Sequence, residues 1–438
     1  MTRQPRLLFV SLANDPGSDR IVAATAHLGA HCGVIGSADA FAARSRFADD
    51  VFRLARLTNY LPESLFLGPR LRDITRAWGP DLIIPLDDLA ARVLREARLR
   101  RMAGPDVQRL IDRSLGEPAN FDTVCSRQGL ADLAKRLGVR TPSQEPALDQ
   151  GSAISAAAAI GYPVVLKREQ TCGGVGVAIA PDEASLTRAF RRAWLRGEAK
   201  RHLRWIPGFG RLEETQLTLQ RYIPGSLAFR AVACADGVVL DGVSFMAERR
   251  NPGETGACTV LRAIEREEMT EASKIIVAEL GCSGFVAFDF IVTADDKAYL
   301  IEMNARPIAC GHLGRLFGHD IYAAMIHHLC GTAYEPPEVV DPPRMIALFP
   351  RELDRDPVGA LLDRPDEVFH DIPRDDPALV EAYAAWLCKR HPDQRALLRR
   401  RFKAESTQAA SAEVSRLEES PLDEETGCAS SLPASAQG

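Results

Sequence analysis

The chain has 438 residues, of which 46% are hydrophobic and 26% are charged, a composition typical of a soluble globular protein with two or three domains. Its formal net charge of -5 excludes a global basic surface for nucleic acid or for an anionic membrane. No run approaches the roughly 18 apolar residues of a membrane-spanning helix, so we expect a cytoplasmic protein with neither a nucleic-acid nor a membrane partner.

Apolar runs alternate with a helical pattern in residues 1–118. Strands are predicted at residues 7–13, 31–36 and 81–88, and a helix at residues 19–30. The first run, LLFVSLA, lacks a small-residue cleavage site and is interpreted as a strand rather than a signal peptide. Continuous apolar strands separated by helices predict a doubly wound parallel sheet, an α/β domain. No GxGxxG motif follows the first strand, so we expect this domain to be scaffold.

Residues 119–332 have a different pattern, which predicts an α+β domain. The dipeptide Asp236-Gly237 between two apolar runs is a strong hairpin signal. The other expected elements are helices at residues 126–138 and 267–281, a helix ending at Gly161, and strands at residues 163–167, 175–180 and 217–225.

The C-terminal part divides into two segments. Residues 333–403 begin with a proline-rich stretch, expected to be a linker or to wrap around the domains, and continue as a helix broken at Pro392. Residues 404–438 are rich in Ser, Ala, Glu and Thr and poor in large apolar side chains, which predicts disorder.

The stretch FVAFDFIVTADDKAYLIEMNARP, residues 285–307, predicts a β-hairpin with unusual polar residues. If the hairpin folds symmetrically about the Asp295–Asp296 bond, Asp289 lies opposite Glu302 on the same face. Because side chains alternate along a strand, Asn304 and Arg306 should lie on the same face as Glu302. The opposite face should pack in the hydrophobic core, and its side chains are Phe288, Phe290, Ile301 and Met303.

Two opposed carboxylates with a neighbouring amide favour a hard cation such as Mg²⁺. The alternative is a solvated acidic face without a ligand. Because like charges repel, the pairing also predicts that neutralising Glu302 leaves the unliganded protein equally stable or more stable.

A glycine-bearing loop, KREQTCGGVGV, follows the strand that ends in Lys167. Its glycines allow backbone N–H groups to approach an anion, and the lysine adds a positive charge. The loop therefore suits phosphate, although it lacks the G-K-[ST] of a P-loop. The alternative is a flexible connection between two strands. The candidate phosphate-binding residues are Lys167, Gly173, Gly174 and Gly176.

Four motifs in order, GYPVVLK…GGVGV, LQRYIPG, GFVAFDFI and YLIEMNARP, resemble those of the ATP-grasp superfamily. The resemblance covers roughly residues 81–318 and implies an ATP-grasp domain of two α+β subdomains at residues 119–332, preceded by the α/β domain. It also implies that ATP and Mg²⁺, with Mn²⁺ as an alternative, are the cofactors.

The resemblance implies a role for each motif residue. Asp289, Glu302 and Asn304 would hold the metal ions, and Arg306 would steady the transferring phosphoryl group or an acyl phosphate. Lys167 would contact the phosphates or the adenine edge, and the glycine loop would close over the triphosphate. The adenine would meet the hinge residues Gln220, Arg221, Tyr222 and Ile223.

The sequence departs from the family pattern at three places. Arg127 stands where a lysine is usual, so it becomes a candidate nucleotide contact. The hinge reads QRY where glutamate is common, and Leu227 stands near the place of a ribose-binding acid. These departures concern nucleotide binding and leave the expected metal site unchanged.

Three arginines surround a small-residue loop in AERRNPGETGACTVLR. Since guanidinium groups suit carboxylates, Arg249, Arg250 and Arg262 are candidate substrate contacts, with a solvated arginine cluster as the alternative.

The resemblance implies an ATP-dependent, ADP-forming ligase that joins a small carboxylate to an amine, both amino-acid-like, through an acyl phosphate. Two alternatives stay open: a carboxylase or carbamoyl-phosphate-type enzyme, and a nucleotide-binding regulator without ligase activity. A homodimer is compatible with all three.

Overall fold

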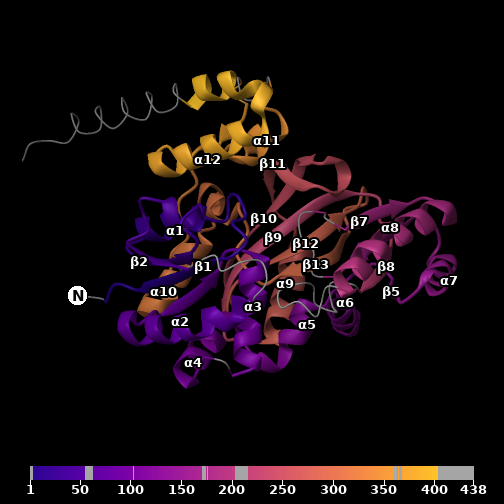
Figure 1. Ribbon diagram of the computed structural model, residues 1–438, viewed down its shortest axis with the longest axis horizontal. Helices are drawn as coiled ribbons and strands as arrows, with labels where there is room; N and C mark the ends of the chain where they lie inside the picture. The colour runs from indigo at the N-terminus through magenta and orange to yellow at the C-terminus, as the bar shows by residue number, and fades with distance from the viewer. Residues whose placement is uncertain are drawn as a thin grey trace, which may run out of the picture.

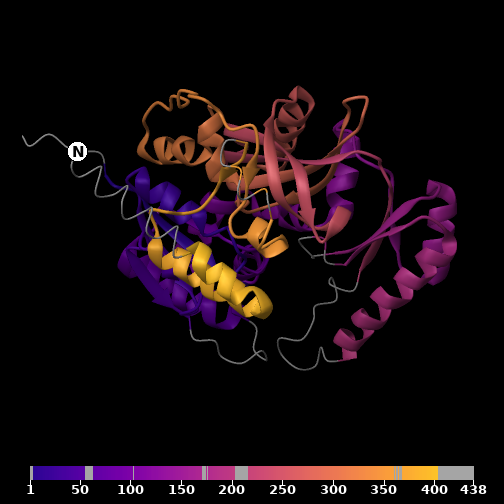
Figure 2. The same cartoon turned by 90° about the horizontal axis from the view of Figure 1, so that it is seen from above.

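The computed structural model describes residues 3–54, 63–101, 103–169, 174, 176–202, 216–359, 361, 364 and 367–402 (Figure 1). Gly173 of the predicted glycine loop and the predicted disordered tail at residues 404–438 lie outside these residues. Figure 2 shows the N-terminal domain and the small sheet described below at opposite ends of the molecule, with the large sheet between them.

The N-terminal domain contains the predicted doubly wound parallel sheet. Its four strands have the order β3-β2-β1-β4 and are β1 (Arg6–Ser11), β2 (His31–Gly36), β3 (Asp50–Arg53) and β4 (Leu82–Pro85). The sequence pattern did not predict β3, whose side chains alternate between half-buried and exposed because it is an edge strand. One face of the sheet packs on α2 (Glu63–Trp78), α3 (Asp88–Leu99) and α4 (Pro105–Leu115), and the other face packs on α1 (Arg20–His27).

The large sheet is the centre of the molecule and has seven strands in the order β13-β12-β9-β10-β11-β14-β15. The predicted hairpin at Asp236-Gly237 joins β9 to β10, and both turn residues have positive φ, which an Asp-Gly turn favours. The strands are β9 (Ser226–Ala235), β10 (Val238–Asn251), β11 (Ala257–Ile264), β12 (Gly284–Val292), β13 (Ala298–Asn304), β14 (Ile346–Ala347) and β15 (Phe369–His370).

Helices cover both faces of the large sheet. The amphipathic helix α9 (Glu267–Leu280) buries its apolar side chains on one face. Helix α10 (Ile321–Cys330), which follows η6 (Gly311–Phe317), packs on the other face. Because α10 also contacts α1, one continuous core joins the large sheet to the N-terminal domain.

The small sheet has four strands in the order β5-β8-β6-β7, which are β5 (Gln144–Ala147), β6 (Val164–Arg168), β7 (Val177–Ala180) and β8 (Leu217–Arg221). One face packs on α7 (Gln150–Ile160) and α8 (Glu183–His202). Helix α7 ends, as predicted, before Gly161, whose φ is +88°. Two helices, α5 (Phe121–Cys125) and α6 (Arg127–Arg136), precede this sheet, after η2 (Pro118–Asn120).

The proline-rich segment is more than a linker, because it adds β14 and β15 to the edge of the large sheet. Helix α11 (Arg351–Arg355) follows β14 directly. Helix α12 (Pro377–Arg390) packs against the N-terminal domain, where Tyr383 stacks on Phe41. The helix ends before η8 (Pro392–Gln394), which confirms the break predicted at Pro392. Within the described residues, no helix has the length and apolar character needed to span a membrane.

Candidate functional site

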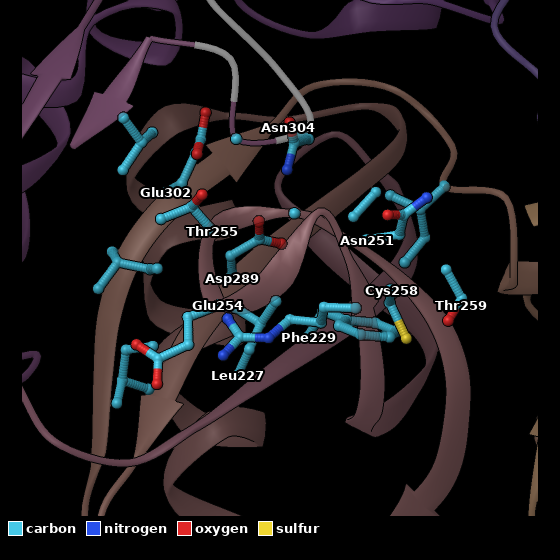
Figure 3. A pocket seen from close by; sticks show the side chains of 18 of the residues that line it. Leu227, Phe229, Asn251, Glu254, Thr255, Cys258, Thr259, Asp289, Glu302 and Asn304 are labelled. Carbon is cyan, nitrogen blue, oxygen red and sulfur yellow. The ribbon is translucent and has the colours of Figure 1, made fainter. Parts of the chain in front are cut away.

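A cavity of about 500 Å³ lies where the small sheet, the large sheet, the N-terminal domain and the C-terminal segment meet. Its lining contains all the polar residues predicted for the β12–β13 hairpin together with Lys167, Gly174 and the hinge. A volume of this size suits a small-molecule ligand. Figure 3 shows Asp289, Glu302 and Asn304 grouped on one part of its wall.

The predicted pairing of Asp289 with Glu302 is confirmed by the register of β12 and β13. The turn, however, is centred on Asp295 and not on the Asp295–Asp296 bond, since Val292 pairs with Ala298 and not with Tyr299. A β-bulge at Ile301 restores the register, because Phe290 pairs with Leu300 and Asp289 with Glu302. A bulge re-aims its side chains, so the prediction for Ile301 is wrong: it lines the cavity instead of joining the core.

Glu302 has a cationic partner that the hairpin alone could not reveal. The Nη2 of Arg127, at the start of α6, donates to Glu302 Oε1 at 2.5 Å, and the Arg127 side chain is only 7% exposed. Burial alone would lower the pKa of Arg127, but Glu302 and Glu169 raise it above its usual value. Since buried Arg127 depends on Glu302 for charge compensation, neutralising Glu302 should destabilise the unliganded protein. This reverses the expectation drawn from the two carboxylates alone.

A second buried acid, Glu169, was not predicted as part of the site. It accepts hydrogen bonds from the backbone N–H of Arg127 at 3.1 Å and from the hydroxyl of Thr218 at 2.9 Å. It therefore ties the start of α6 to the small sheet. Its position two residues after Lys167 was the only sequence signal, and that signal did not distinguish it from a surface acid.

Asp289 differs from Glu302 in its electrostatic environment. Burial, and then the charge on Glu302, raise the pKa of Asp289 above the usual range of a carboxyl group. Arg306, Lys167 and Arg127 act in the opposite direction but do not cancel this effect. Asp289 therefore holds its negative charge at a cost in free energy, which a bound cation would offset.

Lys167 projects from the face of the small sheet that forms one wall of the cavity. It pairs with Val177 on β7, and Val165 pairs with Ile179, so all four side chains share that face. Each of them lines the cavity. Burial lowers the pKa of Lys167 to about 8, although Glu302 partly counteracts the effect. This wall is thus apolar with one buried cation.

The hinge residues Gln220, Arg221, Tyr222 and Ile223 all line the cavity. The side-chain amide of buried Gln220 donates to the side chain of Gln144 at 2.9 Å, so one of its hydrogen-bond donors is already used. The backbone N–H of Arg221 donates to Ser143 and that of Tyr222 to Pro163. Within the described residues the N–H of Ile223 donates to no backbone carbonyl, which leaves it available to a ligand.

Leu227 lies where the sequence comparison expected an acid. It pairs with Ile291 on β12, and both residues line the cavity. The wall beside the hinge is accordingly apolar, which suits a flat aromatic base.

Two of the three predicted glycines are described. Gly174 lines the cavity with φ +79°, and a Cβ there would lie 1.7 Å from the carbonyl oxygen of Thr255. Gly174 thus touches the turn between β10 and β11, and only glycine permits this approach. Gly176 also has a positive φ, +78°.

Arg306 lines the cavity and is held by a partner from another domain. Its Nε and Nη2 donate to Asp88 Oδ1 and Oδ2 at 2.6 and 2.9 Å, a bidentate pair, and its Nη1 donates to the carbonyl of Pro307. Asp88 is the first residue of α3 in the N-terminal domain, so that domain is more than the expected scaffold.

Of the three candidate substrate arginines, the structure brings only Arg250 to the cavity. Neighbouring Arg249 lies off the cavity and pairs with Glu352 at 3.5 Å. Arg262 pairs with Glu248 at 2.6 Å and also lies off the cavity.

The donor set of the hairpin fits Mg²⁺ that arrives with a nucleotide. The described residues contain no cluster of three or more His, Cys, Asp or Glu side chains that could hold a metal ion unaided. The site provides two carboxylates and an amide, so the remaining oxygen ligands of an octahedral ion would come from phosphates and water.

Comparison with known proteins agrees with this geometry. The family model described as "Carbamoyl-phosphate synthase L chain, ATP binding domain" matches residues 126–202. The carbamoyl phosphate synthase large chain of Vibrio cholerae is 25% identical over 196 residues, 43% of this chain and 17% of that protein. The formate-dependent phosphoribosylglycinamide formyltransferase of Burkholderia pseudomallei is 28% identical over 185 residues, 42% of this chain and 44% of that protein. The matches thus span less than half of either relative.

Solved structures share the fold over most of the chain. The biotin carboxylase domain of Hydrogenobacter thermophilus 2-oxoglutarate carboxylase, in complex with MgADP, ADP and bicarbonate, aligns with a TM-score of 0.56 at 20% identity, over 77% of this chain and 70% of that one. Carboxyaminoimidazole ribonucleotide synthase from Aspergillus clavatus, complexed with ATP, aligns with a TM-score of 0.53 at 12% identity, over 76% of this chain and 78% of that one. Ordered motifs, sheet arrangement and these matches together make the chain a member of the ATP-grasp superfamily.

Proposed function

We propose that this protein is an ATP-dependent ligase that joins a small carboxylate to an amine. ATP phosphorylates the carboxylate to an acyl phosphate, the amine attacks it, and ADP and phosphate are released. The observation that carries the proposal is the convergence of Asp289, Glu302, Asn304, Lys167 and Arg306 on one cavity.

The arrangement supports this chemistry because phosphoryl transfer depends on positioning and on neutralised charge. Mg²⁺ held by Asp289, Glu302 and Asn304 would neutralise the phosphate oxygens. Lys167 binds the phosphates from the small sheet, beside Gly174. Arg306, oriented by Asp88, donates to the oxygens on which negative charge develops. The apolar wall at Val165, Ile179 and Leu227 receives the base.

The test is product analysis with a panel of carboxylates and amines in the presence of Mg²⁺ and ATP. We expect ADP and phosphate in equal amounts, with release that depends on the acid. Hydroxylamine should replace the amine and yield a hydroxamate of the acid. Stoichiometric AMP and pyrophosphate would contradict the acyl-phosphate route.

A second candidate is a carboxylase or carbamoyl-phosphate-type reaction, in which bicarbonate is the phosphorylated acid. It is favoured by the sequence match to a carbamoyl-phosphate synthase domain and by the fold match to a biotin carboxylase domain solved with bicarbonate. Bicarbonate-dependent ADP release in the absence of any other acid would select this reaction. Nucleotide binding without turnover in either assay would select the regulator.

The low pKa of Lys167 predicts a pH dependence of nucleotide use. A lysine with a pKa of about 8 loses its charge as the pH rises through that value, so kcat/KM for ATP should fall above about pH 8. Arginine stays protonated throughout this range. The Lys167→Arg variant should therefore lose the alkaline fall, whatever its absolute rate. An identical fall in both proteins would assign the titration to another group.

The close approach of Gly174 to Thr255 predicts a selective effect of substitution. Gly174→Ala must displace the glycine loop, because its Cβ would meet a backbone carbonyl. We expect the KM for ATP to rise on the order of tenfold or more, since small displacements of positioning groups are costly. Gly161→Ala is the matched control: its φ is equally positive, at +88°, but no atom lies within 4 Å of the new Cβ. That variant should lose some stability and keep its KM. Equal KM values for all three proteins would place the loop outside the nucleotide site.

A further inference from the structure

The cavity extends beyond the predicted nucleotide and metal residues to a second region, the distal end. Its lining comes from the loop after β1, from β10 and β11, and from the C-terminal segment. No ligand-binding role was predicted for the C-terminal segment. The lining residues used below are Asp15, Arg250, Cys258, Arg351, Asp354 and Arg390.

Arg250 is a half-buried cation that forms no ion pair with any of the described residues. In the described part of the chain it has no ion-pair or hydrogen-bond partner, unlike the other arginines of the distal end. Arg390, by contrast, forms a bidentate pair with Asp354 at 2.6 and 3.0 Å and lies over the ring of Trp386. Since Arg390 and Asp354 neutralise each other, they add no net charge to the distal end.

Arg351 is anchored but only weakly neutralised. Its Nε and Nη2 donate to the carbonyl of Pro16 at 3.4 and 3.2 Å, which fixes the direction of the side chain. Its nearest carboxylate, that of Asp15, lies 3.6 Å away, beyond hydrogen-bond length. An anion in the cavity could therefore compete for this guanidinium group.

Arg250 and Arg351 both lie near Cys258. Burial raises the pKa of the Cys258 thiol to about 12; the charges of Arg351 and Arg250 oppose that rise, and the smaller effects of Glu352 and Glu248 add to it. Cys258 lies directly opposite Arg250 in the β10–β11 register, and α11 with Arg351 contacts β11. Figure 3 places Cys258 and the one nearby acid of the β10–β11 turn, Glu254, on opposite sides of Asp289.

The side chains around Arg250 and Arg351 strengthen the affinity of this part of the cavity for anions. Phe229, Cys310 and Leu348 line the same cavity and are buried. Charge-assisted hydrogen bonds are stronger next to such apolar walls than in water. Two guanidinium groups therefore face a partly apolar space, and among the described residues neither of them donates a hydrogen bond to a carboxylate.

We propose that the acid substrate carries a second anionic group, a carboxylate or a phosphate, which binds between Arg250 and Arg351 while the first carboxylate is activated at Asp289, Asn304 and Arg306. The inference rests on the proposed function for the identity of the first carboxylate. It extends that function by naming a diacid as the substrate class and the C-terminal segment as part of the specificity site.

The test measures binding separately from turnover. Calorimetric titrations use the full chain with Mg²⁺ and a non-hydrolysable ATP analogue. The probes are the linear dicarboxylates from succinate to pimelate, the monocarboxylates of equal length, and the matching ω-phosphonocarboxylates. At least one diacid or phosphonoacid should bind at least about tenfold more tightly than its monoacid, because one charge-assisted contact is gained. The series that binds better identifies the second group as carboxylate or phosphate.

Variants locate the anion. Arg250→Gln should weaken diacid binding at least about tenfold and leave monoacid binding unchanged. Arg351→Gln should act likewise, with Arg351→Lys retaining part of the affinity if folding permits. Arg249→Gln is the matched control, since it removes the neighbouring charge from a side chain that lies off the cavity. It should bind diacids as the wild type does.

Any of three results would overturn the inference. In the first, the wild type prefers no diacid or phosphonoacid over its monoacid. In the second, Arg249→Gln loses as much diacid affinity as Arg250→Gln. In the third, Arg250→Gln loses affinity for the ATP analogue instead of the diacid.

The proposed ligase reaction is tested separately from the anion site. Diacid binding that depends on Arg250 without acid-stimulated ADP release would support the anion site and contradict the ligase. Acid-stimulated ADP release by monoacids alone would support the ligase and contradict the anion site.

Discussion

The Glu302→Gln variant should turn over ATP at least about a hundredfold more slowly than the wild type, because a ligand for the cation and its charge are lost together. It should also be less stable without ligands, by about 1–3 kcal/mol, since the buried guanidinium group of Arg127 loses the negative charge of its hydrogen-bond partner Glu302. Glutamine keeps one acceptor oxygen for Arg127 Nη2, so the loss should stay below that of an alanine substitution. Urea denaturation of the unliganded protein measures the stability, and a coupled ADP assay measures the turnover.

The opposed carboxylate should behave differently, which makes the pair of variants diagnostic. Asp289→Asn should lose turnover to a similar extent but keep or increase its stability, because burial already disfavours the charged form of Asp289. A carboxyl group with a raised pKa destabilises the folded state as the pH rises through that pKa. The stability advantage of Asp289→Asn over the wild type should therefore grow between about pH 4 and pH 7 and stay constant at higher pH.

An acid at the hairpin turn is the matched control for both variants. Asp295 is exposed, pairs with Lys297 and lies off the cavity, so Asp295→Asn should keep full turnover. Normal turnover in Glu302→Gln or Asp289→Asn would remove the hairpin from the chemistry. Equal stability changes in those two variants would contradict the distinct roles of Arg127 and burial.

The hairpin shows why local pattern predicted so much of the site. Strand periodicity and turn residues identify which side chains share a face, and the facing of Asp289 and Glu302 follows from them. The bulge at Ile301 was not predictable, because no residue in that stretch signals an extra position on one strand. The turn and the bulge shifted the register by one residue each in opposite senses, so the prediction of the pair survived and that of Ile301 did not.

The remaining errors concern contacts between segments far apart in the sequence. Arg127 and Glu302 are 175 residues apart, and Asp88 and Arg306 are 218 apart. No periodicity encodes such pairs, since they depend on how the domains pack. The distal end of the cavity is a stronger case, because all its arginines and acids named above except Arg250 come from the loop before α1 and from the chain after β14. In the sequence these residues are indistinguishable from surface charges.

The second large effect is expected at Arg306, where such a contact orients a charged group. Arg306→Lys keeps the positive charge but cannot form the bidentate pair with Asp88. We expect kcat to fall about 10²–10³-fold, as for loss of one transition-state donor, with little change in the KM for ATP. Asp88→Asn keeps Arg306 and disturbs only its orientation, so kcat should fall on the order of tenfold.

The double variant separates orientation from a direct contribution of Asp88. If Asp88 acts through Arg306, Arg306→Lys combined with Asp88→Asn should be no slower than Arg306→Lys alone, because residues that act as a unit are not additive. Asp112→Asn is the matched control: Asp112 forms an equivalent bidentate pair with Arg98 in the same domain, away from the cavity. It should alter stability without changing kcat. A multiplicative loss in the double variant, or a similar loss of kcat in Asp112→Asn, would show that the N-terminal domain does not act by orienting Arg306.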